Sequence, residues 1–406
     1  METVDMIDET EKKPVFERMA RSLMKRWTPD QVRWHYEHGL ALQSVWAAGD
    51  AAHDDHAAHD DHALCAPSFH TWVKTMYDTL IDKDGRILAY KVDEFNLDQI
   101  NAGKLLFDLY HETGEQRYRT AIETLHKQME GQPRTASGGF WHKKIYPHQM
   151  WLDGVYMAEP FNARYIRAFG RETDTDTDAV ASAFAYDDVV LQFRLMAEKA
   201  RDPKTGLLYH AWDEAREQRW ADPATGCSPH FWGRALGWYC MALVDTLDII
   251  PDDGSRNADF RRLLQEIARS LVQPLLKVQD GSGLWYQVLD QGGREKNYLE
   301  SSASAMFCYF FYRMLRCGYA EKSAETVMRT AANRAWDGLL RLKVKEDPDH
   351  SGELHLTDIC AVAGLGGTPY RDGSYDYYVG ERISTDDFKG VGPFILAGIE
   401  HEAMNN

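Results

Sequence analysis

The stretch Gly283-Leu284-Trp285-Tyr286-Gln287 places a short apolar and aromatic run directly after a glycine, and four similar stretches occur in the chain. The others are Asp84-Gly85-Arg86-Ile87-Leu88, Gly138-Gly139-Phe140-Trp141-His142, Gly206-Leu207-Leu208-Tyr209-His210 and Gly352-Glu353-Leu354-His355-Leu356. Counted from Gly85 through Gly139, Gly206 and Gly283 to Gly352, the intervals are 54, 67, 77 and 69 residues. Recurrence of this kind indicates an architecture built from repeated units.

Each interval contains two segments in which apolar residues recur at three- and four-residue steps, as in 233–249 and 258–277. Every repeat is therefore predicted to be a helical hairpin, and the N-terminal region, including 14–46, supplies one more for a total of about six. An open solenoid usually has a more uniform period than these intervals show. We predict an all-α fold, a closed (α/α)6 barrel forming a single catalytic domain over 1–406, with weak strand signals only after the glycines.

A tandem hexapeptide interrupts the helical pattern near the N-terminus. Ala51-Ala52-His53-Asp54-Asp55-His56 is followed at once by Ala57-Ala58-His59-Asp60-Asp61-His62. Alternating histidine and aspartate could bind a metal ion, but a repeat without an apolar face is more typical of a disordered insertion. We predict such an insertion at about 47–64 and no metal site.

The composition excludes several classes of partner. A net charge of −17 argues against nucleic acid or an anionic membrane as the main partner, although one or two local cations could still bind a small anion. The first 26 residues lack the apolar core of a signal peptide, and no segment approaches the length of a membrane span. The six cysteines show no paired spacing. A cytoplasmic protein with reduced thiols is therefore expected.

Polar or aromatic residues open the helix that follows each turn. If these are inner helices running in the same sense, their starts converge on one rim of the barrel, where helix N-termini favour anions. Twelve Trp and 20 Tyr also suit a pocket for sugars, whose rings pack on aromatic faces. The helix starts contain Asp98, Asp153, Trp232-Gly233-Arg234, Glu300-Ser301 and Thr385–Gly390, and the predicted aromatic wall consists of Trp141, Trp151, Trp232, Trp238 and Trp285.

Each of these residues also has a purely structural interpretation. The carboxylates could be helix caps, the tryptophans could fill the core, and His210 and Arg234 could have structural partners. Their joint placement after successive turns favours a site. Asp98 and Asp153 would be the natural carboxylate pair of a glycosidase, but the sequence does not give their separation, so inversion and retention remain open.

Several short motifs together resemble glycoside hydrolase family 105, the unsaturated rhamnogalacturonyl hydrolases. The similarity extends from about residue 15 to the end, and the 51–62 repeat departs from it. The motifs are Tyr146-Pro147-His148-Gln149-Met150-Trp151-Leu152-Asp153-Gly154, Asn96-Leu97-Asp98-Gln99-Ile100-Asn101-Ala102-Gly103-Lys104, Phe231-Trp232-Gly233-Arg234-Ala235-Leu236-Gly237-Trp238 and Gly390-Val391-Gly392-Pro393-Phe394.

The resemblance implies an (α/α)6 barrel that acts on pectin-lyase products, in which an unsaturated uronic acid is joined to rhamnose, without metal or organic cofactor. It implies that Asp153 is the general acid and base, protonating C4 of the C4=C5 double bond and helping water add at C5. The resulting hemiketal collapses and releases the sugar. Asp98 is implied as the second carboxylate, which contacts the sugar and tunes Asp153.

The resemblance also implies a substrate-binding set consisting of Trp151, His210, Trp232, Arg234, Trp238 and Tyr36, to which we add Trp141 and His148 from the stretches already quoted. Arg234 is the cation that a uronate would require on physical grounds. We expect a small anionic oligosaccharide as partner and a monomer or homodimer. The alternatives are an unsaturated glucuronyl hydrolase acting on glycosaminoglycan fragments, a sugar epimerase or isomerase on the same barrel, and a non-catalytic helical scaffold.

Overall fold

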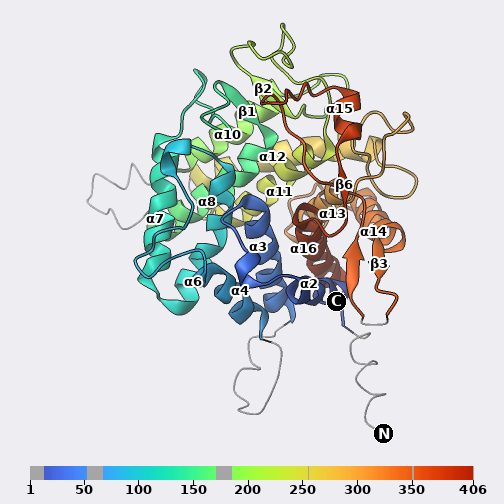
Figure 1. The fold of residues 1–406 in the computed structure, drawn as a ribbon. Coiled ribbons are helices and arrows are strands. Elements are labelled where there is room, and N and C mark those ends of the chain that lie inside the picture. Colours follow the sequence, from blue (N-terminus) through green and yellow to red (C-terminus); the bar gives the residue numbers. More distant parts are fainter. Residues whose placement is uncertain (1–12, 53–66, 171–184, 255, 350–351, 406) are drawn as a thin grey trace.

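A ring of inner helices surrounded by outer helices forms the molecule (Figure 1). The computed structural model describes residues 13–52, 67–170, 185–254, 256–349 and 352–405. The inner segments are α3 (Tyr36–Ala52), the broken run α5 (Asp98–Asn101), η4 (Ala102–Leu105) and α6 (Leu106–Thr113), α8 (Leu152–Phe169), α11 (Gly233–Ile249), α13 (Ser301–Arg316) and α16 (Phe388–Asn405). The outer helices are α2 (Val15–Arg26), α4 (Phe69–Asp78), α7 (Gln116–Gly131), α10 (Ala185–Lys199), α12 (Arg256–Lys277) and α14 (Glu325–Leu342).

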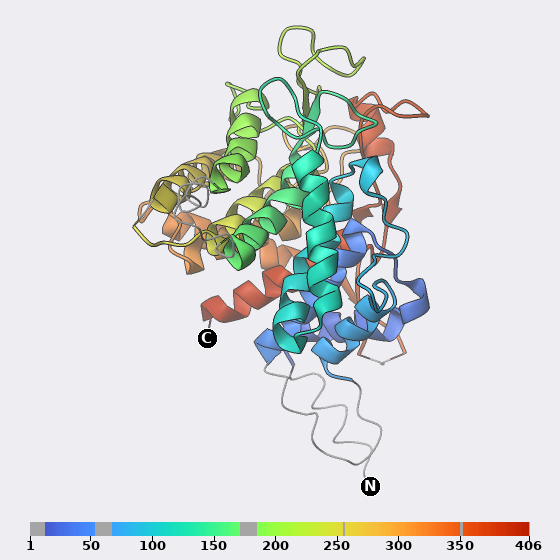
Figure 2. The ribbon, with the colours of Figure 1, turned by 90° about the vertical axis from the view of Figure 1, so that its left-hand side faces the viewer.

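The inner ring closes because its last member, α16, packs against its first, α3. Each remaining inner helix contacts the next one in the chain, from α3 through α5 and η4, α8, α11 and α13 to α16. The outer helices pack around this ring, and α8 is seen along its length in Figure 2. The predicted (α/α)6 barrel is confirmed.

Burial separates the two layers of helices. Nearly every residue of α11 is buried, as expected for a helix surrounded by neighbours. The outer helix α12 instead buries one stripe that includes Phe260, Leu264, Ile267 and Leu271, at the three- and four-residue spacing of an amphipathic helix. The same periodicity that predicted helices from the sequence thus also distinguishes outer from inner positions.

The glycines of the five repeated stretches share one backbone conformation. All have a positive φ, between 73° and 95°, which side chains other than glycine rarely adopt. They are Gly85, Gly138, Gly206, Gly283 and Gly352. At Gly283 a Cβ would also lie 2.1 Å from the Arg334 carbonyl oxygen. The repeat recognised in the sequence is therefore a repeated left-handed turn.

Short antiparallel strand pairs follow the turns, in agreement with the weak strand signals. The pairs are β1 (Gln149–Trp151) with β2 (Ala211–Asp213), β3 (Val344–Glu346) with β4 (Leu354–Leu356), and β5 (Ile359–Cys360) with β6 (Ile383–Ser384). The first pair and α15 (Tyr375–Gly380) lie at the same end of the barrel, at the top of Figure 1. Short 3-10 turns, η1 (Pro29–Gln31) and η3 (Val92–Glu94), complete the elements.

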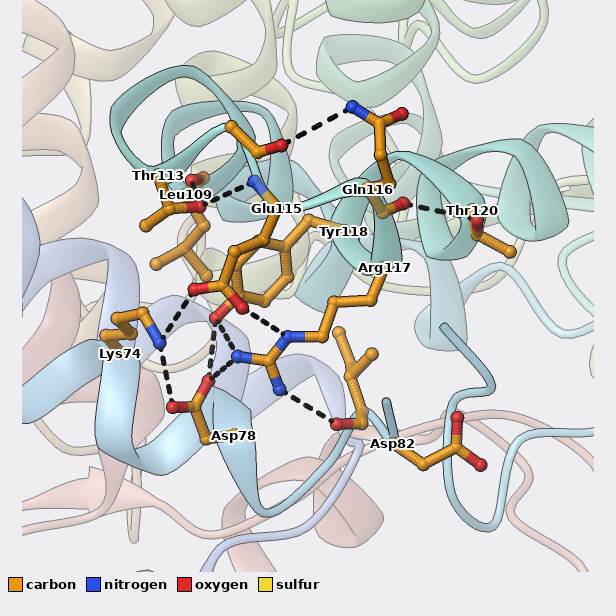
Figure 3. A network of polar contacts seen from close by, with 12 residues as sticks. Lys74, Asp78, Asp82, Leu109, Thr113, Glu115, Gln116, Arg117, Tyr118 and Thr120 are labelled. Carbon is orange, nitrogen blue, oxygen red and sulfur yellow. Dashed lines mark hydrogen bonds and ion pairs between the residues drawn. The ribbon is translucent and has the colours of Figure 1, made fainter. Parts of the chain in front are cut away.

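Outer helices α4 and α7 are joined by a polar network (Figure 3). The Lys74 ammonium lies 2.9 Å from Asp78 and 3.0 Å from Glu115. The Arg117 guanidinium lies 2.6 Å from Asp78 and 2.7 Å from Glu115, and the Tyr118 hydroxyl donates to Asp78 at 2.7 Å. Because each carboxylate has two cationic neighbours, the network holds the two helices in register.

Two further predictions can be compared with the structure. The insertion was predicted to begin near residue 47, but 47–52 continue α3, because Ala48 and Gly49 pack into the core. The tandem hexapeptide lies, from residue 53 onward, outside the described residues, as does Cys65. The five described cysteines form no disulfide, as predicted. None of the described helices is both long and apolar enough to cross a membrane.

Candidate active site

A cavity of about 380 Å³ opens where several inner helices begin. Its walls come from the starts of α3, α5, α8 and α16, from residues 142–151 and from the C-terminal segment 361–387. The described lining residues are His35, Tyr36, Glu37, Asp98, His142, Lys143, Tyr146, Trp151, Asp153, Met157, Ala361, Val362, Ala363, Arg371, Arg382, Asp387 and Lys389. Both predicted carboxylates therefore face one cavity.

Asp153 lies in the first turn of α8, and its side chain is 13% exposed. Its Oδ2 atom lies 3.2 Å from Nε2 of His210, although the two atoms are not aligned as a hydrogen bond. The strand pair β1–β2 sets this neighbour, because the Leu152 amide donates to the His210 carbonyl at 3.0 Å. On its other side, His210 Nδ1 lies 2.7 Å from the Tyr378 hydroxyl. A buried chain thus runs from α15 to the carboxylate.

Asp98 is the first residue of α5 and has a different environment. The Lys143 ammonium lies 2.5 Å from Oδ2, and His142 Nε2 lies 3.4 Å from Oδ1. Burial by itself would raise the pKa of Asp98, but the Lys143 ammonium and His142 together hold that pKa below its ordinary value. Burial also lowers the pKa of His142 to about 4. Asp98 is therefore an anion and His142 a neutral ring near neutral pH.

Three rings are stacked at the wall of the cavity. Trp151 lies between His142, with ring centroids 4.5 Å apart, and Tyr146, with centroids 5.2 Å apart. Its edge meets His210 at 5.2 Å. Trp151 also precedes α8 directly, so the stack and Asp153 are held by the same stretch of backbone. This arrangement provides a flat aromatic surface beside the carboxylate.

The inner end of the cavity is closed by aromatic residues. Tyr36 lines the cavity and meets the edge of Trp238, with centroids 6.3 Å apart. Trp238 is 1% exposed and stacks on Tyr156 at 4.6 Å. Trp232 stacks on Tyr378 and is equally buried. The predicted Trp232 and Trp238 therefore support the site from behind the surface that lines the cavity.

Arg234 is also placed behind the lining, at 1% exposure. Its Nη1 donates to the Cys360 carbonyl, and Ser302 Oγ lies 3.5 Å away. Burial alone would lower its pKa, but Cys360 and the Glu300 carboxylate keep that pKa above its ordinary value. Its Nε atom is buried without a hydrogen-bond partner. Arg234 remains a fixed buried cation whose contact with a substrate stays a prediction.

Three predicted aromatic residues lie away from the cavity. Trp285 was predicted to be part of the wall, but it is fully buried against Phe307, and its indole N–H donates to the Leu275 carbonyl. Trp141 and His148 contact each other, with centroids 4.8 Å apart, and do not line the described cavity. A tryptophan after a repeat glycine can turn into the core, because the local pattern does not determine its direction.

Sequence reasoning missed several residues that the cavity contains, notably His142, Lys143 and Arg371, whereas Lys389 belongs to the predicted helix start Thr385–Gly390. One of them had a signal. His142 follows Gly138 by four residues, as His210 follows Gly206, and both histidines are buried beside the candidate carboxylates. Aligning the repeats by their glycines would have identified it. Lys143 and Arg371 lie on loops that carry no comparable pattern.

The described residues offer no metal site, and a second cavity lacks aromatic residues. Within the described parts of the chain, no group of three or more His, Cys, Asp or Glu side chains is placed to hold a metal ion. A larger cavity of about 540 Å³ is lined by residues of α12, α14 and the segment before α14, including Glu266, Arg269 and Glu321. Its lining contains no aromatic residue, so it lacks the surface expected for a sugar.

A carboxylate pair facing one aromatic-walled cavity at the mouth of an (α/α)6 barrel has the features of a glycoside hydrolase. The comparisons with known proteins agree. The chain belongs to glycosyl hydrolase family 88, whose sequence pattern matches residues 13–405. A glycoside hydrolase of family 105 from C. acetobutylicum superposes with a TM-score of 0.85 at 40% identity, covering 96% of this chain and 100% of that one. The resemblance to family 105 is thereby confirmed.

Two relatives in sequence add to this result. Protein Atu3128 of Agrobacterium fabrum is 41% identical over 246 residues, which cover 60% of this chain and 97% of that protein. Unsaturated rhamnogalacturonyl hydrolase YesR of Bacillus subtilis is 27% identical over 289 residues, covering 70% of this chain and 71% of that protein. The protein is a glycoside hydrolase, and the isomerase and scaffold alternatives are set aside.

Proposed function

We propose that this enzyme removes the unsaturated uronic acid from the non-reducing end of unsaturated rhamnogalacturonan oligosaccharides. The observation that carries the proposal is the placement of Asp153, nearly buried beside His210 and Trp151, in the same cavity as the anionic Asp98. The similarity to YesR, named for this activity, supports the substrate class. We further propose that the enzyme acts in the cytoplasm, as a monomer or homodimer.

The reaction begins with proton transfer to carbon. Asp153, as a carboxylic acid, donates its proton to C4 of the C4=C5 double bond, and the ring oxygen stabilises the positive charge that develops at C5. Water then attacks C5 and returns a proton to the Asp153 carboxylate. The C5 hemiketal opens to a ketone, and the anomeric carbon releases the aglycone as an alcohol. One carboxylic acid thus acts as both acid and base.

The neighbours of Asp153 suit these two roles. Asp153 lies beside Trp151 and His210, and His210, held by Tyr378, can contact the carboxylate after the transfer. The Asp98 carboxylate, paired with Lys143, stays ionised and can accept hydrogen bonds from sugar hydroxyls. The two carboxylates therefore have different neighbours in one cavity: Asp98 is paired with Lys143, and Asp153 lies beside His210.

The test follows the ultraviolet absorbance of the conjugated double bond in an unsaturated rhamnogalacturonan disaccharide. We expect the absorbance to decay with wild-type enzyme and with Asp93→Asn, a change at an exposed carboxylate. Asp153→Asn should keep the wild-type melting temperature and lose nearly all turnover. Decay with an unsaturated chondroitin disaccharide alone would identify a glucuronyl hydrolase instead. Normal turnover by Asp153→Asn would refute the assignment of the acid.

A further inference from the structure

The cavity contains four cationic side chains that differ in how their charge is balanced. Lys143 pairs with Asp98, and Lys389 pairs with Glu37 and with Asp387. Within the described residues, the other two, Arg371 and Arg382, form no ion pair with a carboxylate. In a chain with a net charge of −17, two cavity cations that form no ion pair among the described residues require an explanation.

Arg371 is held rigidly by neutral oxygen atoms. Its Nε donates to the Gly366 carbonyl at 2.9 Å, and its Nη2 donates to the Tyr146 hydroxyl at 2.9 Å and the Leu365 carbonyl at 3.1 Å. The guanidinium also packs closely on Gly364, where a Cβ would lie 2.4 Å from Nη1. Carbonyl and hydroxyl oxygens orient the group without neutralising it, so its positive charge remains available to an anion.

Arg371 and Arg382 belong to a more exposed wall of the cavity than the two carboxylates. The two candidate carboxylates, Asp98 and Asp153, are buried side chains of the same cavity. Arg371 and Arg382 belong to the segment 361–387; Arg371 is half-buried and Arg382 is exposed. A saccharide whose end lies at Asp153 can therefore extend toward solvent along this more exposed wall.

The wall also connects to the reacting end. Tyr146, which accepts the bond from Arg371, stacks on Trp151 beside Asp153. The apolar part of the same wall is unusually open, since Val362 is 51% exposed. A guanidinium beside an exposed apolar side chain and an aromatic stack is suited to a sugar that carries a carboxylate.

Resting on the proposed function, we propose that Arg371, assisted by Arg382, binds the carboxylate of a second uronic acid located beyond the bond that is cleaved. The enzyme then prefers longer unsaturated oligosaccharides, whose aglycone contains an acidic sugar, to the unsaturated disaccharide. If Arg371 served only to tie the loop 364–371 together, its replacement would affect all substrates equally.

The experiment compares kcat/KM for three substrates. They are the unsaturated disaccharide with a neutral aglycone, an unsaturated tetrasaccharide with a second uronate, and the same tetrasaccharide with that second uronate as its methyl ester. We expect Arg371→Gln to lower kcat/KM for the acidic tetrasaccharide by about tenfold or more, the effect of losing a charge-assisted hydrogen bond. The disaccharide and the ester should lose much less, so the ratio of kcat/KM for the acidic tetrasaccharide to kcat/KM for its ester should fall by about tenfold.

Two additional variants and one binding measurement complete the test. Arg382→Gln should show the same selectivity with a smaller loss, and Arg262→Gln, at an exposed arginine of α12, should show none. The dissociation constant of the acidic tetrasaccharide is measured by calorimetry in Asp153→Asn with and without Arg371→Gln. Absence of disaccharide turnover by the wild-type enzyme refutes the proposed function. In that case the two dissociation constants, with and without Arg371→Gln, still test whether Arg371 binds the second uronate. Equal losses on all three substrates, or unchanged binding, overturn the inference.

Discussion

Replacing Lys143 by methionine removes the ammonium that lies 2.5 Å from Asp98 and keeps much of the side-chain volume. With an effective dielectric constant of about 20, Coulomb's law gives an attraction of about 7 kcal/mol at this separation, offset in part by the desolvation of both charges. Removing one partner of a buried pair costs about 3–5 kcal/mol. We expect about 3 kcal/mol, because Asp98 can take up a proton instead of remaining an unpaired anion.

The expected change in melting temperature follows from the size of the chain. An unfolding entropy of about 2.1 cal/mol/K per residue over 406 residues means that 3 kcal/mol lowers Tm by about 3 to 4 °C. The matched control is Lys144→Met, because Lys144 is exposed and donates to a backbone carbonyl at 3.4 Å instead of pairing with a carboxylate. Its Tm should stay within about 1 °C of the wild-type value.

The pH dependence of the Tm difference between wild type and Lys143→Met provides a sharper test than the size of that difference at one pH. In the wild type the folded-state pKa of Asp98 is lowered, so the stabilisation is fully present above the ordinary pKa of aspartate and is lost as the pH falls through the lowered value. Without Lys143, burial dominates and raises that pKa. The folded variant then binds a proton that the unfolded chain does not, and part of its stability returns as the pH falls.

We therefore expect the difference in Tm between wild type and Lys143→Met to narrow from pH 8 to pH 5. His142 is a poor substitute for the missing cation, because burial is the main reason that its pKa lies at about 4 in the wild type, and burial is unchanged in the variant. Differential scanning calorimetry at pH 5, 6, 7 and 8 measures the difference. A gap that is constant, or that widens toward pH 5, would refute the electrostatic reasoning about Asp98.

Two other changes test the support of the site and the repeat. Tyr378→Phe removes the hydroxyl that lies 2.7 Å from His210 Nδ1. In steady-state kinetics we expect kcat to fall by about tenfold with KM little changed. An unaltered kcat would contradict an orienting role for this hydroxyl. Gly283→Ala should lower the free energy of unfolding by about 2–4 kcal/mol in chemical denaturation, because the new Cβ would lie 2.1 Å from the Arg334 carbonyl oxygen. The control is Gly293→Ala, which also has a positive φ but lies in open space and should lower it by about 1 kcal/mol. Equal losses would show that backbone strain alone is responsible.

The starts of the inner helices could be read from the sequence because they depend on local features. Asp98 begins α5, Leu152 begins α8 and Ser301 begins α13, capped by Glu300, whose side chain accepts a hydrogen bond from the Ala303 amide. Such caps and apolar periodicities act over one or two turns of chain. Their recurrence was sufficient to predict a barrel and to place two carboxylates on one rim.

The composition of the cavity wall could not be predicted in the same way. Lys143 and Arg371 lie on loops, and their positions depend on which other loops they meet: Lys143 pairs with Asp98 across 45 residues, and Arg371 bonds Tyr146 across 225. The prediction that Trp285 lines the pocket was wrong for a related reason. An aromatic side chain after a turn fits either the core or the cavity, and only the neighbouring helices decide between them.

By itself, therefore, the sequence determined the repeated left-handed turns, the helices between them, the two carboxylates at helix starts and the membership in a glycoside hydrolase family. The tertiary structure alone decided that Asp98 is an ion-paired anion while Asp153 lies beside His210, and that Arg371 lines their cavity without an ion pair among the described residues. The physical reason is the separation along the chain over which each interaction acts. Turns and caps are set within a few residues, whereas burial and charge at a site depend on groups that ring closure brings together from distant units.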